Sequence, residues 1–490
     1  MKRRIFSKMI LSVLLVCTLF TTVACSNSDE YITKGTNLNQ EDLNSSDRVT
    51  IYTYVDPDNK DLHYDQDTKF YYPILDMVHM YNNYCSLNKM GEYSVKVVSF
   101  SSRDRMIQQM STEIMAGGGP DIIILDNELP ISKLINQGAF ADMNTLLKND
   151  KSERKINLDD YDNTLMDTGV FKGKRYMMPM LIEPDIYISN SALFKDYDLA
   201  TNTRLTYSNI NNKLKKFANN SNNLSLTDSY SSSKEIILQY INDNINKEDY
   251  TTDFETKKFK STIESLKKLV KKSIADTKTT KDLSKSECLL SKGTTDKETG
   301  IYTPYNFSLS HMSGYSSTQT TFTGGITEKE NQSRATISCG FMINNNSNKK
   351  EKAFEFIKYS LGERMQRFIT FDSTYGDTYN ITVNKDALNN SLSSFAYGDT
   401  YNITVNKDAI NTSLSSFAYG GTDFDEIKEQ DSFMDKYASY INSINTYEIR
   451  DGYYNDKVIG SLVDDYLQDK ISIDNFIANL SSKTKLYLYE

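Results

Sequence analysis

The feature that most constrains the fold is a short apolar segment at residues 120–125, Pro-Asp-Ile-Ile-Ile-Leu. An unbroken apolar run of this length is typical of a strand buried on both faces, as in parallel sheets covered by helices. Two β-rich segments precede it, at residues 49–55 and 93–100. Apolar residues at helical spacing fill residues 72–86 and 103–115 between these strands. The order strand, helix, strand, helix, strand predicts βαβ units and therefore an α/β fold with a parallel sheet.

A run of three glycines separates the second of these helices from the apolar strand. Ser101 and Ser102 are suited to cap the start of that helix, and Gly117-Gly118-Gly119 to end it. A dinucleotide-binding loop has the reverse order, because its glycines follow a strand and open a helix. We therefore interpret the glycines as a helix end. The residues expected on the buried face of the helix are Met106, Ile107, Met110, Ile114 and Met115.

Further elements are predicted along the rest of the chain. Residues 170–176 indicate a turn between two strands, because Lys-Gly-Lys-Arg lies between Val-Phe and Tyr. Helical patterns occur at residues 131–147, 210–217, 350–361 and 459–482. A helical stripe that we interpret as core packing consists of Phe259, Ile263, Leu266, Val270 and Ile274.

Length and composition limit the classes of function. A chain of 490 residues predicts two to three domains, since domains average about 150 residues. The net charge of −9 argues against a nucleic-acid-binding protein, whose footprint is basic. His63, His79 and His311 are too scattered to indicate a zinc site, and we expect no metal and no cofactor.

The first 24 residues are expected to be a targeting segment. They begin with four positive charges and contain no negative ones. The charged start is followed by an apolar run that is too short to span a bilayer comfortably. The run ends at Thr22-Val23-Ala24-Cys25, which resembles the lipobox of a bacterial lipoprotein signal. We predict a signal peptide at residues 1–24, lipidation of Cys25 and a flexible tether at residues 25–48; an ordinary secretory signal is the alternative. Removing the signal would leave a net charge of −13.

Three cysteines would remain unmodified, namely Cys85, Cys288 and Cys339. An odd number without CxxC spacing does not indicate a disulfide framework or a metal site. We expect three buried free thiols.

A tandem duplication occupies residues 375–418. Residues 375–396 recur as residues 397–418 with only two differences, Leu388/Ile410 and Asn390/Thr412. Two copies are too few for a solenoid, which needs about three or more repeats. We interpret the duplication as a surface insertion, of which one copy is dispensable.

Polar residues follow two of the predicted parallel strands. Asp126 and Asn127 come directly after the apolar strand, and Tyr54 ends the first strand. Ligands of open parallel α/β sheets bind beyond the carboxyl ends of the strands. These residues are therefore candidate ligand contacts; the alternative is that they are only loop and helix-cap residues.

Six segments resemble, in order, family 1 extracellular solute-binding proteins of ABC importers. Residues 116–123 are similar to the family's small-residue, Pro-Asp, β-strand signature, and residues 173–179 resemble its Gly-Lys-x-Tyr-x-x-Pro hairpin. The other four resembling segments are residues 131–147, 186–194, 341–361 and 466–490. The resemblance extends over nearly the whole chain after residue 50.

The resemblance implies a two-lobed periplasmic-binding-protein-like fold of type II, with strands that cross a hinge. We expect lobe 1 at residues 49–182 and about 338–372, and lobe 2 at residues 183–337 and about 419–490. The duplication would then lie near a lobe crossing. By resemblance, Glu183, Asp126, Asn127, Tyr54, Tyr305 and Ser338 are the expected ligand contacts.

The function implied is reversible capture and not catalysis. We expect a monomeric, lipid-anchored receptor on the extracellular face of a Gram-positive cell membrane, delivering a sugar or oligosaccharide to an ABC permease. The chain has no Trp and 34 Tyr, so Tyr or Phe would stack on a flat ligand face. The alternatives are a peptide or polyamine receptor, a secreted glycosidase and a receptor without a ligand.

Overall fold

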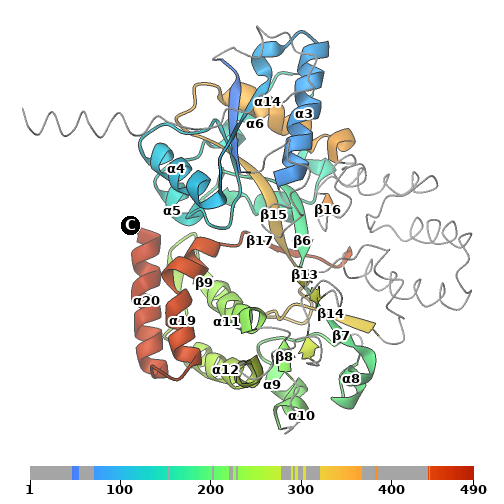
Figure 1. Ribbon diagram of the computed structural model, residues 1–490, viewed down its shortest axis with the longest axis vertical. Coiled ribbons are helices and arrows are strands. Elements are labelled where there is room, and N and C mark those ends of the chain that lie inside the picture. Colours follow the sequence, from blue (N-terminus) through green and yellow to red (C-terminus); the bar gives the residue numbers. More distant parts are fainter. Residues whose placement is uncertain are drawn as a thin grey trace, which may run out of the picture.

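The structure is a computed structural model with two lobes stacked along its long axis (Figure 1). The N-terminal strands and helices form one lobe, and the helices that end the chain form part of the other. The structure describes residues 47–54, 71–152, 154–200, 203–219, 225–227, 230–277, 288–290, 293–295, 302–304, 320–366, 381–382, 440 and 442–489. The predicted signal peptide, Cys25, the tether, Tyr305 and almost all of the duplication lie outside these residues.

The first lobe is built on the predicted parallel βαβ units. Strand β1 (Val49–Thr53) pairs in parallel with β2 (Val95–Ser99) and with β3 (Ile122–Ile124). Helices α3 (Tyr71–Leu87) and α4 (Arg103–Met115) connect them, which confirms the order expected from the sequence. The Ser102 hydroxyl accepts a hydrogen bond from the Arg105 amide and caps α4.

One strand from late in the chain completes this sheet. Strand β15 (Arg334–Ile343) lies antiparallel between β3 and β6 (Met178–Pro184), giving the order β16-β6-β15-β3-β1-β2. The first three residues of β15 also pair with β17 (Thr446–Glu448). Strand β16 (Ile381–Thr382), the described part of the first repeat copy, pairs with β6 at the edge. The sheet therefore brings together five separated segments of the chain.

The helical pattern predicted at residues 131–147 is two helices. Helix α5 (Ile131–Asn136) is followed by a left-handed Gly138 (φ +71°), and Asp142 caps the start of α6 (Met143–Asn149). The expectation for Met115 is wrong, because this last residue of α4 is 67% exposed while Met106, Ile107, Met110 and Ile114 are buried. The helical spacing of the apolar residues did not reveal that the last residue of α4 lies outside the core of the lobe.

The predicted turn at residues 170–176 is confirmed as a hairpin of β4 (Val170–Phe171) and β5 (Lys174–Arg175). Lys172 (φ +49°) and Gly173 (φ +76°) both have the left-handed backbone that such a tight turn requires. The remaining short elements of this lobe are η1 (Gly91–Tyr93), η2 (Leu158–Asp160), α7 (Asn163–Asp167) and α14 (Lys350–Leu361).

The second lobe has a helical core. The predicted stripe on α12 (Lys257–Thr277) is buried at Phe259, Ile263, Leu266 and Val270. It packs with α11 (Tyr230–Asp243) and α20 (Ile473–Tyr489). The predicted helix at residues 459–482 is instead two helices, α19 (Gly460–Leu467) and α20, and the short helix η5 (Tyr454–Val458) precedes them. Asp469 (φ +59°) separates α19 from α20.

Small strand pairs and short helices cover the rest of this lobe. Strand β7 (Ile186–Asn190) pairs with β14 (Thr320–Gly324), and β8 (Ser225–Thr227) pairs with β11 (Cys288–Leu290). The others are β9 (Ile245–Asn246), β10 (Thr251–Thr252), β12 (Gly293–Thr295), β13 (Tyr302–Pro304), α8 (Ser191–Asp196), α9 (Ile210–Lys213) and α10 (Lys215–Ala218).

Two separate hydrophobic cores divide the chain. The first core, which we call lobe 1, runs to Ile186, resumes at Ala335 and includes Tyr440 and Ile444. The second core, lobe 2, runs from Tyr187 to Ile326 and resumes at Tyr454. Within the described residues, the chain therefore passes between the lobes three times. The crossings lie side by side, because the Asp185 amide donates to the Arg334 carbonyl and Arg334 pairs with Thr446.

Two of the three expected free thiols are described. Cys85 and Cys339 are free and buried in lobe 1. Burial raises the pKa of the Cys85 thiol to about 11 and that of the Cys339 thiol to about 12. The structure does not describe the side chain of Cys288. Within the described residues, no helix is long and apolar enough to cross a membrane, and no group of acidic, His and Cys side chains could hold a metal.

Candidate functional site

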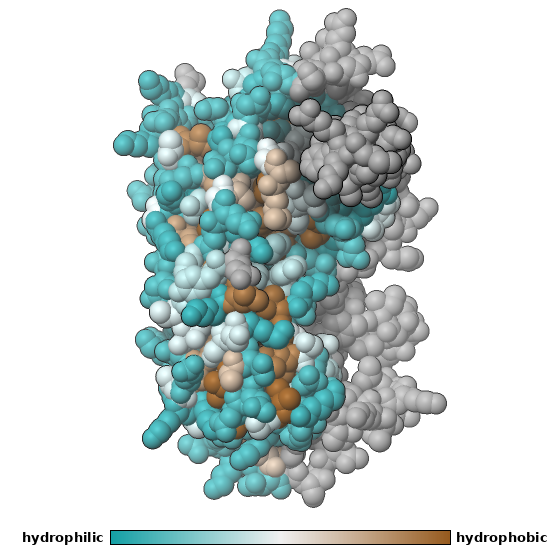
Figure 2. Space-filling model, turned by 90° about the vertical axis from the view of Figure 1, so that its left-hand side faces the viewer, coloured by the Kyte–Doolittle hydropathy of each residue, from teal (hydrophilic) through white to brown (hydrophobic). Residues whose placement is uncertain are grey.

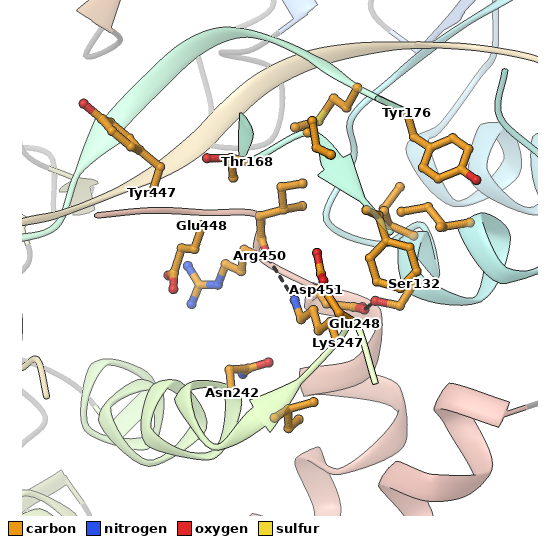
Figure 3. A pocket seen from close by; sticks show the side chains of 18 of the residues that line it. Ser132, Thr168, Tyr176, Asn242, Lys247, Glu248, Tyr447, Glu448, Arg450 and Asp451 are labelled. Atoms are coloured by element: carbon orange, nitrogen blue, oxygen red, sulfur yellow. Dashed lines mark hydrogen bonds between the residues drawn. The ribbon is translucent and has the colours of Figure 1, made fainter. Parts of the chain in front are cut away.

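A cavity of about 430 Å³ lies between the two lobes, beside the crossings (Figure 3). Lobe 1 contributes the start of α5 and the β4–β5 hairpin, and lobe 2 contributes the end of α11 and the β9–β10 hairpin. The third crossing, from Thr446 to Asp451, forms the wall between them. We call this space the interlobe cavity.

Both aromatic rings and polar groups line its walls. Phe171 and Tyr176 come from the hairpin of lobe 1, and Tyr447 comes from β17. The Tyr447 hydroxyl donates to the Asp162 carboxylate at 3.0 Å, and burial raises the pKa of this phenol. Among the described residues no hydrogen-bond partner holds the Tyr176 hydroxyl, so this ring can present both a flat face and a polar edge to a solute.

An ion network surrounds the crossings. Arg334 is 4% exposed, and its Nη2 donates to the Asp243 carboxylate at 2.7 Å. Its Nη1 lies 3.8 Å from Oε2 of Glu448. Gln239 also donates to Glu448, at 2.8 Å. Burial raises the pKa of the Glu448 carboxyl above its ordinary value, although the charge of Arg334 opposes that shift.

Asp451 links three parts of the molecule. Its carboxylate accepts hydrogen bonds from Ser132 of lobe 1 (3.0 Å), from Tyr487 of α20 (2.9 Å) and from the Tyr454 amide (3.0 Å). Three donors thus meet at one buried carboxylate. Lys247, from the β9–β10 hairpin, donates to the carbonyl of Ile449 in the third crossing at 3.4 Å (Figure 3).

The five sequence-predicted contacts that the structure describes lie around the crossings and strand ends and do not line the interlobe cavity. Asp126 is buried and accepts from Arg103 at 2.9 Å and from the Glu128 amide at 2.8 Å. Tyr54 is half-buried against the core of lobe 1. The backbone of Asn127 touches Gly452, where a Cβ would lie 2.5 Å from the Asn127 carbonyl oxygen.

The other two described predictions lie on the crossing strands. Glu183 of β6 is opposite Thr336 of β15, which is itself opposite Glu448 of β17. Ser338 is a half-buried residue of β15. Their role as ligand contacts stays a prediction, as does that of Tyr305, which lies outside the described residues.

Sequence reasoning missed most of the residues that form the cavity. The majority come from three distant segments, around residues 167–177, 239–248 and 446–451, and the others come mainly from α5 and β15; only the folded chain brings these segments together. One local signal exists: Thr446-Tyr447-Glu448-Ile449-Arg450 alternates in polarity at the strand period, within a helix-rich part of the sequence.

Comparison with known proteins identifies the family. The family model described as bacterial extracellular solute-binding protein matches residues 85–393, more than half of the chain. No match was found among curated proteins.

Several solved structures share the fold at low sequence identity. A cyclic α-maltosyl-1,6-maltose binding protein from Arthrobacter globiformis is 13% identical, with a TM-score of 0.53, over 90% of this chain and 98% of that one. UgpB from Mycobacterium tuberculosis, in complex with glycerophosphocholine, is 11% identical (TM-score 0.52; 91% and 99% covered). An ABC substrate-binding protein from Listeria monocytogenes, in complex with cycloalternan, is 15% identical (TM-score 0.50; 89% and 97% covered).

These similarities agree with the architecture and confirm the predicted fold class. Two α/β lobes, three adjacent crossings and a cavity between the lobes are what a binding protein that closes on its ligand requires. The chain belongs to the family of bacterial extracellular solute-binding proteins.

Proposed function

We propose that this protein is a lipid-anchored receptor that captures a sugar or oligosaccharide between its lobes and delivers it to the permease of an ABC importer. The observation that carries the proposal is the interlobe cavity, whose walls come from both lobes and from a crossing. A solute held there contacts both lobes at once, so its binding energy favours the closed arrangement.

The chemistry of the walls favours a hydroxylated solute. Sugar hydroxyls both donate and accept, and the cavity offers amide, carboxylate and cationic groups for either role. Phe171 and Tyr176 supply the apolar faces that Trp would otherwise provide. Five acidic residues against three basic ones disfavour an anionic solute; the acids are Asp167, Asp243, Glu248, Glu448 and Asp451, and the bases are Lys247, Arg334 and Arg450.

The ligands of similar structures support the same class. Cycloalternan and cyclic maltosyl-maltose are named for two of the proteins with this fold. Glycerophosphocholine is named for a third, so the fold alone does not select sugars. The alternatives are therefore a peptide or a polyamine in the same cavity, and the acidic excess favours a polyamine over an anion.

We propose the anchor and location from the N-terminal sequence. Cys25 after Thr22-Val23-Ala24 would carry the lipid, and residues 25–48 would tether the lobes outside the membrane of a Gram-positive cell. The receptor would act as a monomer with permease subunits as its partners. Globomycin, which blocks lipoprotein signal cleavage, should cause accumulation of the longer precursor, and Cys25→Ala should release the protein from membranes.

We further propose that the predicted strand-end and crossing residues act when the lobes rotate. Glu183, Asn127 and Ser338 border the crossings, and Tyr54 and Asp126 lie at the carboxyl ends of β1 and β3. Glu183→Gln should weaken solute binding if Glu183 contacts the solute. Unchanged affinity would restrict the site to the interlobe cavity.

The test of the receptor function is thermal unfolding of the full-length chain with a panel of oligosaccharides, monosaccharides, peptides and polyamines. A ligand at 100 times its Kd should stabilise by about 2.7 kcal/mol, which raises Tm by a few degrees. Tyr176→Ala should abolish the shift, whereas the control Tyr93→Ala, within lobe 1, should keep it. A polyamine or peptide hit without any saccharide hit would refute the sugar assignment.

The competing class of function is an enzyme. A secreted glycosidase would release product from the saccharide that stabilises it, whereas a receptor returns its ligand unchanged. Chromatography of each stabilising saccharide after prolonged incubation distinguishes the two. Product formation that Glu448→Gln or Asp243→Asn abolished would overturn the receptor proposal.

A further inference from the structure

Two hairpin tips, one from each lobe, meet next to the interlobe cavity. Phe171 and Lys172 form the tip of the β4–β5 hairpin in lobe 1. Tyr250 lies at the tip of the β9–β10 hairpin in lobe 2. Lys172 (φ +49°) and Tyr250 (φ +62°) both have left-handed backbone, which is uncommon for residues of this size. Such conformations persist only where surrounding contacts hold them.

The turn that presents Tyr250 is fixed within its own lobe. The Asp249 carboxylate accepts hydrogen bonds from the Thr251 amide (3.0 Å) and from the Thr251 hydroxyl (2.6 Å). The Tyr489 ring, near the end of α20, lies edge-on to Tyr250 with 5.2 Å between the ring centroids. Lobe 2 therefore holds the Tyr250 ring in a defined position toward lobe 1.

Lobe 1 contacts this ring with three side chains. The Lys172 ammonium lies 4.0 Å from the centroid of the Tyr250 ring, within range of a cation–π interaction. The centroids of the Phe171 and Tyr250 rings lie 6.3 Å apart. The Tyr250 hydroxyl donates to the side-chain oxygen of Asn136, the last residue of α5. A cation, a ring and an acceptor from one lobe thus converge on one side chain of the other.

Asn136 makes a second contact between the lobes. Its side-chain amide donates to the Leu488 carbonyl at 2.9 Å, at the end of α20. The face that includes α5 and α20 is seen in Figure 2, where apolar patches interrupt a mostly hydrophilic surface at mid-height. The lobes therefore touch on this side through a small cluster of specific contacts.

The same elements line the interlobe cavity. Ile135 and Phe171 come from α5 and the lobe 1 hairpin. Ile245, Lys247 and Glu248 come from the lobe 2 hairpin, and the last two are labelled in Figure 3. Separation of these elements would widen the cavity and would also break the contacts of Tyr250. Opening on this side is thus coupled to loss of the contacts.

We propose that Asn136, Phe171, Lys172 and Tyr250 form an interlobe clasp that holds the lobes together without solute and limits how readily the cavity opens. A cation–π pair, an aromatic pair and a hydrogen bond, each of modest strength, together shift an open–closed equilibrium by about tenfold or more. The clasp deepens the proposed function, but its test needs no solute.

The test is Tyr250→Asn in the full-length chain. Asn tolerates left-handed backbone but lacks the ring and the phenol, so the turn is kept and the clasp is lost. Small-angle X-ray scattering should show a larger radius of gyration than for the unmodified protein. Hydrogen exchange should accelerate by about tenfold in residues 131–138 and 245–252, which face each other across the clasp.

Tyr93→Ala is the matched control. The Tyr93 ring also carries a lysine, Lys352, whose ammonium lies 5.7 Å from its centroid, but both residues belong to lobe 1. This variant should leave the radius of gyration and both exchange segments unchanged. Equal radii and equal exchange for Tyr250→Asn and the unmodified protein would overturn the clasp, whatever the solute panel shows.

A second variant protects the test against misfolding. If Tyr250→Asn loses the cooperative thermal transition, Asn136→Ala removes both bonds of Asn136 from an exposed position at the end of a helix. It should produce the same changes in scattering and exchange, to a smaller extent. No change in either measurement for this folded variant would refute the proposal.

Discussion

Ser132 at the start of α5 donates a hydrogen bond of 3.0 Å to Asp451, the residue at which the third crossing enters lobe 2. Asp451 also accepts from the Tyr487 hydroxyl, and burial together with this carboxylate raises the pKa of the phenol. The pair joins lobe 1 to the crossing segment, so it contributes to stability and fixes where that segment leaves the cavity.

Asp451→Ala should lower the free energy of unfolding by about 3 kcal/mol, because it leaves buried donors without an acceptor. Ser132→Ala removes one donor and should cost about 1 kcal/mol. Urea denaturation of both variants measures the difference. A smaller loss for Asp451→Ala than for Ser132→Ala would contradict the central place given to Asp451.

The contact between α12 and the end of α19 should weaken in acid. Hydrogen bonds from Lys267 and then Lys271 lower the pKa of the Asp469 carboxyl to about 2. A lowered pKa means that the contribution of this group is complete above its unfolded value of 3.8 and is lost as pH falls toward 2. Asp469→Asn, which keeps the left-handed backbone, should reduce the pH dependence of Tm in that window; an unchanged dependence would contradict this assignment.

Cys85 and Cys339 should resist alkylation in the folded protein. Burial raises the pKa of both thiols, so the reactive thiolate is scarce at pH 8 and is also inaccessible. Iodoacetamide labelling followed by peptide mass spectrometry should find both unmodified until denaturant is added. Labelling of either thiol at the rate of a free peptide would show that lobe 1 opens locally around it.

Deletion of residues 397–418 should leave the free energy of unfolding nearly unchanged. The described part of the duplication, β16, belongs to the first copy and pairs with β6. Changing the length of an insertion alters its closure entropy by only about 0.6 kcal/mol per doubling. Deletion of residues 375–396 is the matched control, since the two products differ only at two positions. An unfolded product from the first deletion would refute the dispensability of the second copy.

The local parts of the fold could be predicted because their signals are local. Strands β1, β2 and β3 and helices α3 and α4 follow from the period of apolar residues and from the Ser102 cap. The break between α5 and α6 was missed, because the apolar pattern continues across Gly138 while the backbone there is left-handed.

The site could be predicted only in part, because non-local pairing builds it. The strand-end rule selected Tyr54 and Asp126, but Arg103 occupies the Asp126 carboxylate. The cavity depends on β15 placing Arg334 beside Thr446, a register that no local pattern encodes. Glu448 and Tyr447 become site residues only through that pairing.

The central place of β15 has a consequence for synthesis of the chain. Ribosomes make β3 and β6 long before β15, so the lobe 1 sheet has an unfilled gap with two open edges while the nascent chain grows. Open strand edges are templates for aggregation. Lobe 1 therefore cannot mature as an independent N-terminal unit during translation, and a chain truncated before Arg334 should require a chaperone to remain monomeric.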